Sequence, residues 1–473
     1  MKFLIYTFCF TILVASCKKE SKNEKKFKEE IAAVTKKAVK PNIIFLLADD
    51  MGYGELGAYG QKEIQTPFLD SLLHQGKKFT DFYAGTSVCS PSRASLMTGM
   101  HTGHLSIRGN KGAMDGKWTR IPLRKTEITI PELLKEAGYQ SAMIGKWHLG
   151  VPEDTSTWAK GRGFDYAVQE QWGEDKNGKE IDERVHWVNN DQDSIFYDYT
   201  KYKILDEFRT NFALDYLKNK RNPEKPYFLY MSYRIPHAHE YYISHNDLYR
   251  EKGWPEEERN HAARITLFDN QVRRLFHLLK EQGELENTLI IFSSDNGPQK
   301  ENHDPLFFKS SGGLKGHKRD LYEGGVREPM FAYWKGKISP GTVSKHQATF
   351  YDVLPTLAEV AGINAPEQVD GISFLPELLD QEQQKHKYLY WEIQEGNKPA
   401  GFKQAIREGD WKAVRIADSY HTELYNLAND IFETKDISGQ HPEIVAAMND
   451  LFKKESIKNE FYPYSGGIFN ENN

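Results

Sequence analysis

Four apolar segments of strand length constrain the fold most, because each one ends in polar residues able to do chemistry. They read NIIFLLADD, YQSAMIGKWH, PYFLYMSYRIPHAH and TLIIFSSDNG. Segments with a helical pattern lie between them, such as TIPELLKEAG before the second and ITLFDNQVRRLFHLLKEQG before the fourth. Strands that alternate with helices predict an α/β fold with a largely parallel sheet that is buried on both faces. Ligands of such sheets bind beyond the carboxyl ends of the strands, so we expect the four polar ends to form one site.

The polar ends supply two complementary kinds of side chain. A buried strand often ends in a turn-forming Asp or Asn, a lone Lys is usually a solvated surface charge, and a lone His is often structural. Two polar strand ends would therefore be weak evidence for a functional site, whereas four ends with complementary side chains favour one. The acidic and amide candidates are Asp49, Asp50, Asp295 and Asn296, and the basic ones are Lys146, His148 and His237.

The domain pattern changes after about residue 375. Short strand-like pieces follow, such as KYLYWEIQ and TELYNL, and then the helical HPEIVAAMNDLFKKES. This predicts a large domain over residues 41–375 and a smaller α+β domain with an antiparallel sheet over residues 376–473. The net charge of −5 leaves no broad basic face, which argues against nucleic acid as a partner.

The N-terminus reads as an export signal. Its apolar run from Phe3 to Ala15 would reach only about 20 Å as a helix, which is short of a bilayer core of about 30 Å. Val14-Ala15-Ser16-Cys17 resembles the bacterial lipobox, and a Lys-rich tether over residues 18–40 follows it. We therefore expect residues 1–17 to be a lipoprotein-type signal peptide and the protein to be exported and held in a bacterial envelope by a lipid on Cys17. The alternative is an ordinary cleaved signal in which Cys17 is incidental.

Cys89 is the free cysteine that remains of three, because Cys9 leaves with the signal and Cys17 is acylated. In SVCSPSRASLMTG, Ser90 suits an N-cap and Pro91 the first helical position, so a helix is predicted to start just after Cys89. Its thiol would then be acidified at the positive end of the helix, with Arg93 one turn further on. This arrangement suits an oxyanion ester as substrate. The alternative is a small buried Cys at a helix start.

Cys89-x-Pro91-x-Arg93 followed by ASLMTG resembles the signature of the type I sulfatases. Further similar segments span most of the chain: ADDMGYGELGAYG, GYQSAMIGKWHLG, GRGFD, SSDNG and GLKGHKRDLYEGGVREP. The resemblance implies the alkaline-phosphatase-like fold, a large mixed and mainly parallel sheet sandwiched by helices. It also implies that Cys89 is oxidised to Cα-formylglycine by a formylglycine-generating or anaerobic sulfatase-maturating enzyme.

The resemblance further implies roles for the residues that match the motifs. The metal ligands are Asp49, Asp50, Asp295, Asn296 and the modified Cys89, and their oxygen donors suit one Ca²⁺, with Mg²⁺ as the alternative ion. The catalytic residues are Cys89, Arg93, Lys146, His148, His237 and Lys318. Lys315 and Arg319 compete with Lys318 for its role, and His239 competes with His237.

The mechanism implied by the family has two steps. One hydroxyl of the formylglycine hydrate attacks sulfur with help from the metal and from Asp295 as base, while His237 or Lys318 protonates the leaving oxygen. The second hydroxyl then expels sulfate and restores the aldehyde, with His148 assisting.

The expected function is hydrolysis of sulfate monoesters on a sulfated polysaccharide, or its oligosaccharides, of the ulvan, carrageenan or glycosaminoglycan type. The loops within residues 153–200 and 238–260 are expected to select the substrate. One alternative is a phosphoester or phosphonate-ester hydrolase of the same superfamily. Another is an inactive surface lipoprotein that binds glycans through aromatic residues such as Trp158, Trp172, Trp187, Tyr241 and Tyr242.

Overall fold

The computed structural model describes residues 40–170, 185–190, 194–237, 248–301, 303–417 and 421–466. The chain from Pro41 onward forms one compact unit. The predicted signal peptide and tether, with Cys9 and Cys17, lie outside the described residues, apart from Lys40. Among the residues described, no helix is both long and apolar enough to cross a membrane.

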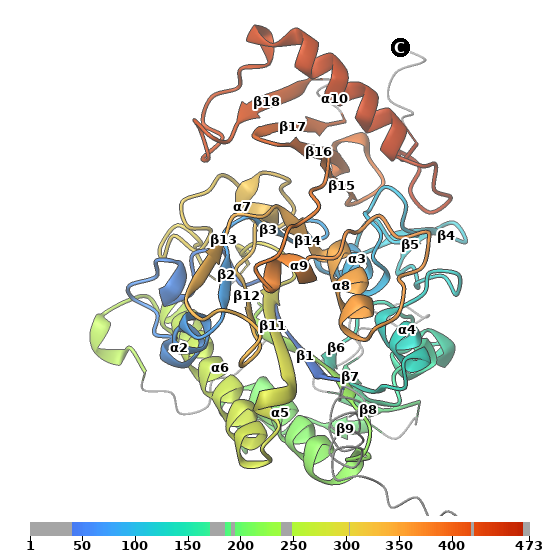
Figure 1. Cartoon of the computed structure of the whole chain (residues 1–473). Coiled ribbons are helices and arrows are strands. Elements are labelled where there is room, and N and C mark those ends of the chain that lie inside the picture. Colours follow the sequence, from blue (N-terminus) through green and yellow to red (C-terminus); the bar gives the residue numbers. More distant parts are fainter. Residues whose placement is uncertain are drawn as a thin grey trace, which may run out of the picture. The chain divides into compact units, whose positions relative to one another are not determined.

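A ten-stranded mixed sheet forms the centre of this unit (Figure 1). Its strands, in spatial order, are β13 (Thr342–Ser344), β2 (Lys77–Phe79), β12 (Met330–Tyr333), β11 (Thr288–Ser294), β1 (Asn42–Asp49), β10 (Tyr227–Pro236), β6 (Gln140–Lys146), β7 (Tyr166–Glu170), β8 (Val185–Val188) and β9 (Ser194–Phe196). The four strands expected from the apolar segments are the neighbours β11, β1, β10 and β6, and they run parallel. The α/β prediction is therefore confirmed.

The register brings the polar strand ends to one edge of the sheet. Ala48 at the end of β1 pairs with Ser294 of β11, and Asp49 pairs with Pro236 of β10. Gly145 of β6 pairs with Ser232 of β10. The residues that follow these pairs therefore emerge side by side, as the parallel arrangement predicts.

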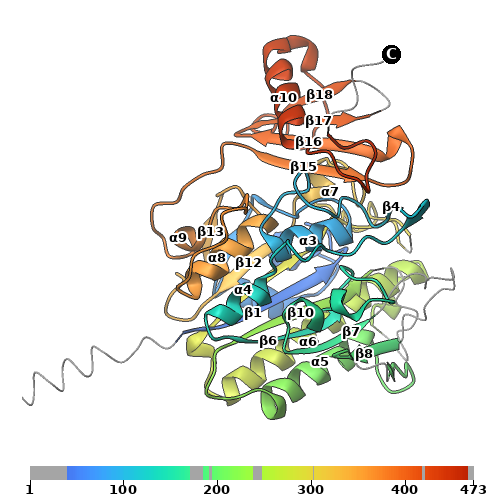
Figure 2. The same ribbon diagram turned by 90° about the vertical axis from the view of Figure 1, so that its right-hand side faces the viewer.

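Helices cover both faces of the sheet, as the alternation of side chains along β1 requires. Ile43, Phe45 and Leu47 pack into one apolar cluster, and Ile44 and Leu46 pack into the other. On the first side lie α3 (Cys89–Thr98), α4 (Ile130–Glu136) and α8 (Val353–Val360). On the second side lie α2 (Pro67–His74), α5 (Leu205–Asp215) and α6 (Glu256–Glu281), and Figure 2 shows the two layers. Helix α6 begins nine residues before the segment that the sequence pattern marked at Ile265.

The strands at the two edges of the large sheet are mostly short, and the sequence reading did not single them out. β12 pairs antiparallel with β11 and β2, and β8 pairs antiparallel with β7 and β9. Most of these strands have only three to five residues, too few for a clear alternation of apolar and polar positions. Smaller pairs join β3 (Phe82–Tyr83) to β14 (Ala348–Thr349) and β4 (Gly112–Met114) to β5 (Lys117–Thr119).

The C-terminal part contains the expected antiparallel sheet. Its four strands are β15 (Leu389–Gln394), β16 (Phe402–Glu408), β17 (Trp411–Ile416) and β18 (Thr422–Asn426), and α10 (Pro442–Glu455) packs on it. Trp391 in β15 is buried, and its indole Nε1–H donates to the carbonyl oxygen of Ala84 at 2.9 Å. Arg108 pairs with Glu392 at 2.7 Å. This sheet is therefore attached to the segments on either side of α3.

Candidate active site

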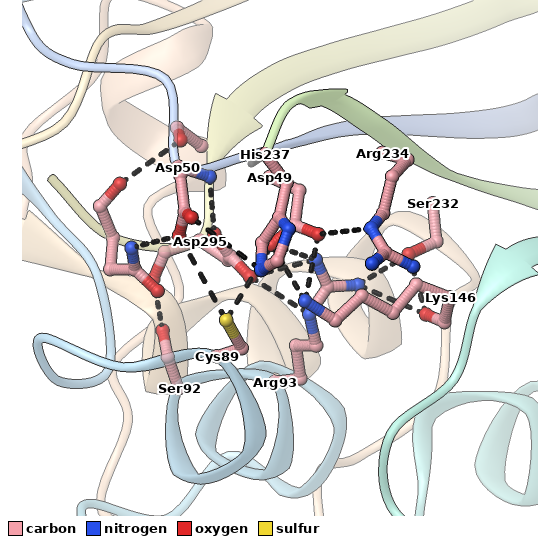
Figure 3. Close-up of polar contacts among 12 residues, drawn as sticks. Asp49, Asp50, Cys89, Ser92, Arg93, Lys146, Ser232, Arg234, His237 and Asp295 are labelled. Carbon is pink, nitrogen blue, oxygen red and sulfur yellow. Dashed lines mark hydrogen bonds and ion pairs between the residues drawn. The ribbon is translucent and has the colours of Figure 1, made fainter. Parts of the chain in front are cut away.

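Cys89 occupies the first turn of α3 and faces the acidic end of β1. The helix begins at Cys89 itself, two residues before the predicted first helical position at Pro91, and its N-cap is Val88 instead of Ser90. The Ser90 hydroxyl instead donates to the carbonyl oxygen of His148 at 2.8 Å. Cys89 Sγ lies 3.5 Å from Asp49 Oδ1 and 3.9 Å from Asp50 Oδ1. Figure 3 shows Cys89 facing these carboxylates.

The thiol of Cys89 is not acidified, contrary to the expectation from its place at a helix start. Burial raises its pKa to about 12, and the nearby ammonium groups of Lys146 and Lys318 offset only part of that rise. The carboxylates of Asp295 and Asp49 raise the pKa further. An unmodified Cys89 is a neutral thiol at neutral pH.

The four acidic and amide candidates come together beside this thiol. Ligand atoms of Asp49, Asp50, Asp295 and Cys89 all lie within 4.8 Å of one another. The backbone N–H of Asp50 donates to Asp295 Oδ1 at 3.0 Å, and Asn296 Nδ2 donates to Asp50 Oδ1 at 2.6 Å. Asp50 adopts a left-handed backbone with φ of 65°, which turns the chain sharply where β1 ends.

This group has the features of a cation site. Asn296 Oδ1 is buried and accepts no hydrogen bond from any described residue, although such an oxygen normally has a partner. Burial raises the pKa of Asp295 to about 7, and the neighbouring carboxylates of Asp49 and Asp50 add to that effect. A divalent cation would offset this concentration of negative charge. Three carboxylates and an amide oxygen fit Ca²⁺ or Mg²⁺ better than zinc.

Three cationic side chains contact the same carboxylates. Arg93 Nε and Nη2 lie 2.9 and 2.7 Å from Asp295 Oδ2, and Nη2 lies 3.3 Å from Asp49 Oδ1. Lys146 Nζ donates to both oxygens of Asp49 at 2.9 and 2.7 Å. Lys318 Nζ donates to Asp50 Oδ2 at 2.7 Å. All three are buried, so the site combines buried carboxylates with cations that can face an anionic substrate group.

Two buried histidines complete the predicted set. His237 Nε2 lies 3.7 Å from Asp50 Oδ2. His148 follows β6 and has a φ of 58°, which is a left-handed backbone. Burial lowers the pKa of both imidazoles well below the usual value, and cations around them lower it further. Both rings are therefore neutral at neutral pH.

The competitors of Lys318 lie elsewhere. Lys315 Nζ donates to the hydroxyl of Tyr425 at 2.9 Å. Arg319 has a side chain that is 46% exposed and lies 3.3 Å from Glu301. Of the three basic residues in this segment, Lys318 is the one beside the carboxylates. His239, the competitor of His237, lies outside the described residues.

The sequence reading missed Ser232 and Arg234, which project from β10. Ser232 Oγ accepts a hydrogen bond from Arg93 Nη1 and donates to the carbonyl oxygen of Lys146 at 2.6 Å. Arg234 Nε lies 3.8 Å from Asp49 Oδ2, and its Nη1 lies 2.8 Å from both oxygens of Glu170. Ser and Arg inside an otherwise apolar strand could have identified these two residues as part of the site, because buried polar groups need partners.

The aromatic residues suggested as sugar platforms are only partly described. Trp158 is buried, and its indole N–H donates to the carbonyl oxygen of Val151 at 3.0 Å, so it offers no free face. Trp187 is half-buried and packs on Trp158 with ring centroids 6.0 Å apart. Trp172, Tyr241 and Tyr242 lie outside the described residues.

Comparison with known proteins places the chain in a family. The sequence model described as "Sulfatase" matches residues 41–363, and one described as "N-sulphoglucosamine sulphohydrolase, C-terminal" matches residues 316–458. An arylsulfatase of Hemicentrotus pulcherrimus is 31% identical over 85% of this chain and 73% of its own length. An N-acetylgalactosamine-6-sulfatase of Canis lupus familiaris is 33% identical over 72% of this chain and 66% of its own length. The crystal structure of Ps i-CgsB in complex with k-i-k-neocarrahexaose superposes with a TM-score of 0.75 at 26% identity, covering 90% of this chain and 95% of that one. The chain therefore belongs to the sulfatase family of sulfuric ester hydrolases.

Proposed function

We propose that this sulfatase hydrolyses sulfate monoesters of a saccharide with a nucleophile made from Cys89. The observation that supports this most is the position of Cys89 Sγ, buried 3.5 Å from Asp49 Oδ1 on the first turn of α3. A thiol with a pKa of about 12 is a weak nucleophile at neutral pH, which makes an unmodified Cys89 unsuited to the reaction. Oxidation to formylglycine would supply a hydrated aldehyde with two hydroxyl groups on one carbon.

Asp49, Asp50, Asp295 and Asn296 are the residues that would hold one Ca²⁺, with Mg²⁺ as the alternative ion. When bound, that ion supplies positive charge for a sulfate oxygen and for the nucleophile. Its ligands lie at the ends of β1 and β11, which are paired in the sheet, so the site is held by the core of the fold.

The remaining side chains bind the sulfate and move protons in this proposal. Arg93 bridges Asp49 and Asp295 and so orients two ligands at once. Lys146 and Lys318 present ammonium groups from two different segments, which suits a tetrahedral anion between them. Of the two candidate acids, His237 and Lys318, the charged ammonium group of Lys318 is the one that protonates the departing sugar oxygen, because the imidazole of His237 is neutral. The neutral imidazole of His148 accepts a proton when sulfate is released.

The substrate class we propose is a sulfated polysaccharide, or its oligosaccharides, of the ulvan, carrageenan or glycosaminoglycan type. Among the relatives, one is named for a sulfated amino sugar and one is solved with a neocarrahexaose. The loops within residues 153–200 and 238–260 would select among these substrates.

We further propose that residues 41–375 and residues 376–473 form two domains. We also propose that residues 1–17 direct export, and that a lipid on Cys17 anchors the protein through the tether of residues 18–40.

Peptide mass spectrometry of active, natively produced protein tests the nucleophile. We expect formylglycine at position 89, and we expect Cys89→Ala to abolish sulfate release. The matched control is Cys17→Ala, which should prevent lipidation and leave turnover of a soluble substrate unchanged. Fully active protein that carries only intact Cys89 would refute the proposed nucleophile.

Matched esters test the reaction class. We expect kcat/KM for a saccharide sulfate to exceed that for the corresponding phosphate by at least about tenfold, because the site holds ligands for one divalent ion, and phosphoryl transfer often uses two ions about 4 Å apart. A preference for phosphate on one preparation would move the protein to the phosphoester hydrolases of the same superfamily. A panel of defined sulfated oligosaccharides then identifies the sugar and the position of the sulfate.

A further inference from the structure

A second buried group of acid and imidazole side chains lies outside the candidate active site. Glu55, His261 and His303 offer ligand atoms that all lie within 4.8 Å of one another, and we call these residues the Glu55 cluster. All three are buried. Glu258, one turn before His261 on α6, is also buried and lies beside the cluster, with Oε2 3.8 Å from His303 Nδ1.

Few hydrogen bonds hold the Glu55 cluster together. Glu55 Oε1 lies 2.5 Å from His261 Nε2, and Glu55 Oε2 accepts from the backbone N–H of Gly52 at 2.8 Å. The rings of His261 and His303 are stacked, with centroids 3.7 Å apart. Stacking brings the two rings together, but it supplies no hydrogen bond to their nitrogens, and His261 Nε2 has its partner only in Glu55.

Several polar atoms of the group lack partners despite their burial. Both ring nitrogens of His303, Nδ1 of His261 and Oε2 of Glu258 make no hydrogen bond to any described residue. A buried imidazole with neither nitrogen satisfied is unfavourable, because the ring has lost its water and gained nothing in return. The arrangement therefore points to a missing ligand that binds nitrogen and oxygen together.

We propose that Glu55, His261 and His303 bind one Zn²⁺, with Glu258 as the fourth ligand. Two imidazoles with carboxylates are a ligand set that zinc prefers, whereas the oxygen-only group of Asp49, Asp50, Asp295 and Asn296 suits calcium. Two carboxylates would also neutralise the charge of the ion. Ligand atoms around tetrahedral zinc lie about 3.3 Å apart, so Glu55 and His261 must separate by roughly 0.8 Å and the two rings must turn out of their stack.

The location of this zinc site suggests its role. Glu55 lies on the turn that follows Asp49 and Asp50, and His303 lies on the segment that follows Asp295 and Asn296. His261 lies on α6, and Arg264 one turn later donates to the carbonyl oxygen of His237 at 3.1 Å. Zinc would therefore join the two segments that carry the calcium ligands to the helix behind them, and act by positioning them.

A second histidine group shows why the Glu55 cluster stands out. His101 and His104 also lie near an acid, Glu455. Both rings there have partners: His101 lies 3.2 Å from Glu455 Oε2, and His104 lies 2.8 Å from Asp370 Oδ1. That group is satisfied by hydrogen bonds and requires no metal ion.

Metal analysis of the full chain tests the proposal. The protein is stripped of metal, saturated with Ca²⁺ so that the oxygen site is filled, titrated with Zn²⁺ and analysed by elemental mass spectrometry and thermal melting. We expect about one zinc per chain and a higher melting temperature with zinc. His261→Gln and His303→Gln should each weaken zinc binding by at least tenfold and remove the zinc-dependent shift.

Two control variants carry the same change at other histidines. His277→Gln alters an exposed residue of the same helix, and His104→Gln alters the second histidine group. Both variants should bind zinc as tightly as the wild-type protein does. The proposed site is wrong if the wild-type protein binds no zinc, or if His303→Gln binds zinc as tightly as the wild-type protein. It is also wrong if His104→Gln loses zinc binding. Because His303 lies in a loop, that variant keeps the test open should His261→Gln fail to fold.

Discussion

Replacing Arg93 by Lys tests whether the shape of the guanidinium, as well as its charge, holds the site together. The fork of Arg93 reaches four groups: Asp295, Asp49, the carbonyl oxygen of Lys146 and Ser232 Oγ. An ammonium group can replace the contacts to the carboxylates but cannot span all four, because it is a single point of charge. Arg93→Lys therefore keeps the charge balance and loses the two bonds made by Nη1.

The expected loss follows from those two bonds. A hydrogen bond from a charged donor contributes about 1.5–3 kcal/mol. Ser232 Oγ still donates to the carbonyl oxygen of Lys146 at 2.6 Å, so neither acceptor is left wholly unpaired. Because that bond remains, we expect Arg93→Lys to lower the free energy of unfolding by about 2–3 kcal/mol, the contribution of one charged hydrogen bond and not of two. Arg93→Met removes the charge from between two buried carboxylates and should lower it by about 3–5 kcal/mol, with a greater loss in EDTA than in calcium.

Urea unfolding in calcium and in EDTA measures these changes, and sulfate release measures activity. The control is Arg319→Lys, the same change on a side chain that is 46% exposed, and it should alter stability by less than about 0.5 kcal/mol. We expect Arg93→Lys to lower kcat by about 100-fold, because a displacement of about 1 Å in the site has that effect. If Arg93→Lys matches Arg319→Lys in both stability and activity, Arg93 does not organise the site.

Three further changes are expected to have defined outcomes. Asp295→Ala should abolish turnover and remove the rise in melting temperature that calcium produces, and normal activity of this variant in EDTA would contradict the metal assignment. Gly145→Ala should lose more than about 3 kcal/mol in urea unfolding, because φ is 114° and the added Cβ would lie 1.8 Å from the carbonyl oxygen of Ser232. Gly138→Ala, with φ of 83° and open space around the Cβ, should lose only about 1 kcal/mol, and equal losses would show that the clash is unimportant. Glu433 shares Lys412 with Glu323, and burial raises the pKa of Glu433 to about 7. Glu433 therefore stabilises the folded protein in its protonated form. This contribution is fully present below about pH 4.5 and is lost as the pH rises through 7. Between pH 5 and 8 the free energy of unfolding should therefore fall less for Glu433→Gln than for the wild-type protein. Parallel pH profiles of the two proteins would refute this.

The sequence by itself determined the centre of the fold and most of the candidate site. β1, β6, β10 and β11 are long, buried apolar runs, and parallel strands bring their carboxyl ends to one edge. The acidic pair at the end of β1 and the Asp-Asn pair after β11 could therefore be predicted to meet from the sequence alone. Cys89 and Arg93 could be placed together because one helical turn separates them.

Only the tertiary structure decided the features that depend on contacts between distant segments. Lys315, Lys318 and Arg319 are alike in sequence, and the fold alone brings Lys318 to Asp50. Local sequence predicted an acidic thiol at Cys89, but burial by the surrounding chain raises the pKa of that thiol. The Glu55 cluster likewise joins residues separated by about 200 positions in the chain. Strand and helix periodicity is a local property, whereas burial, pKa and ligand sets are sums over neighbours that only the folded chain supplies.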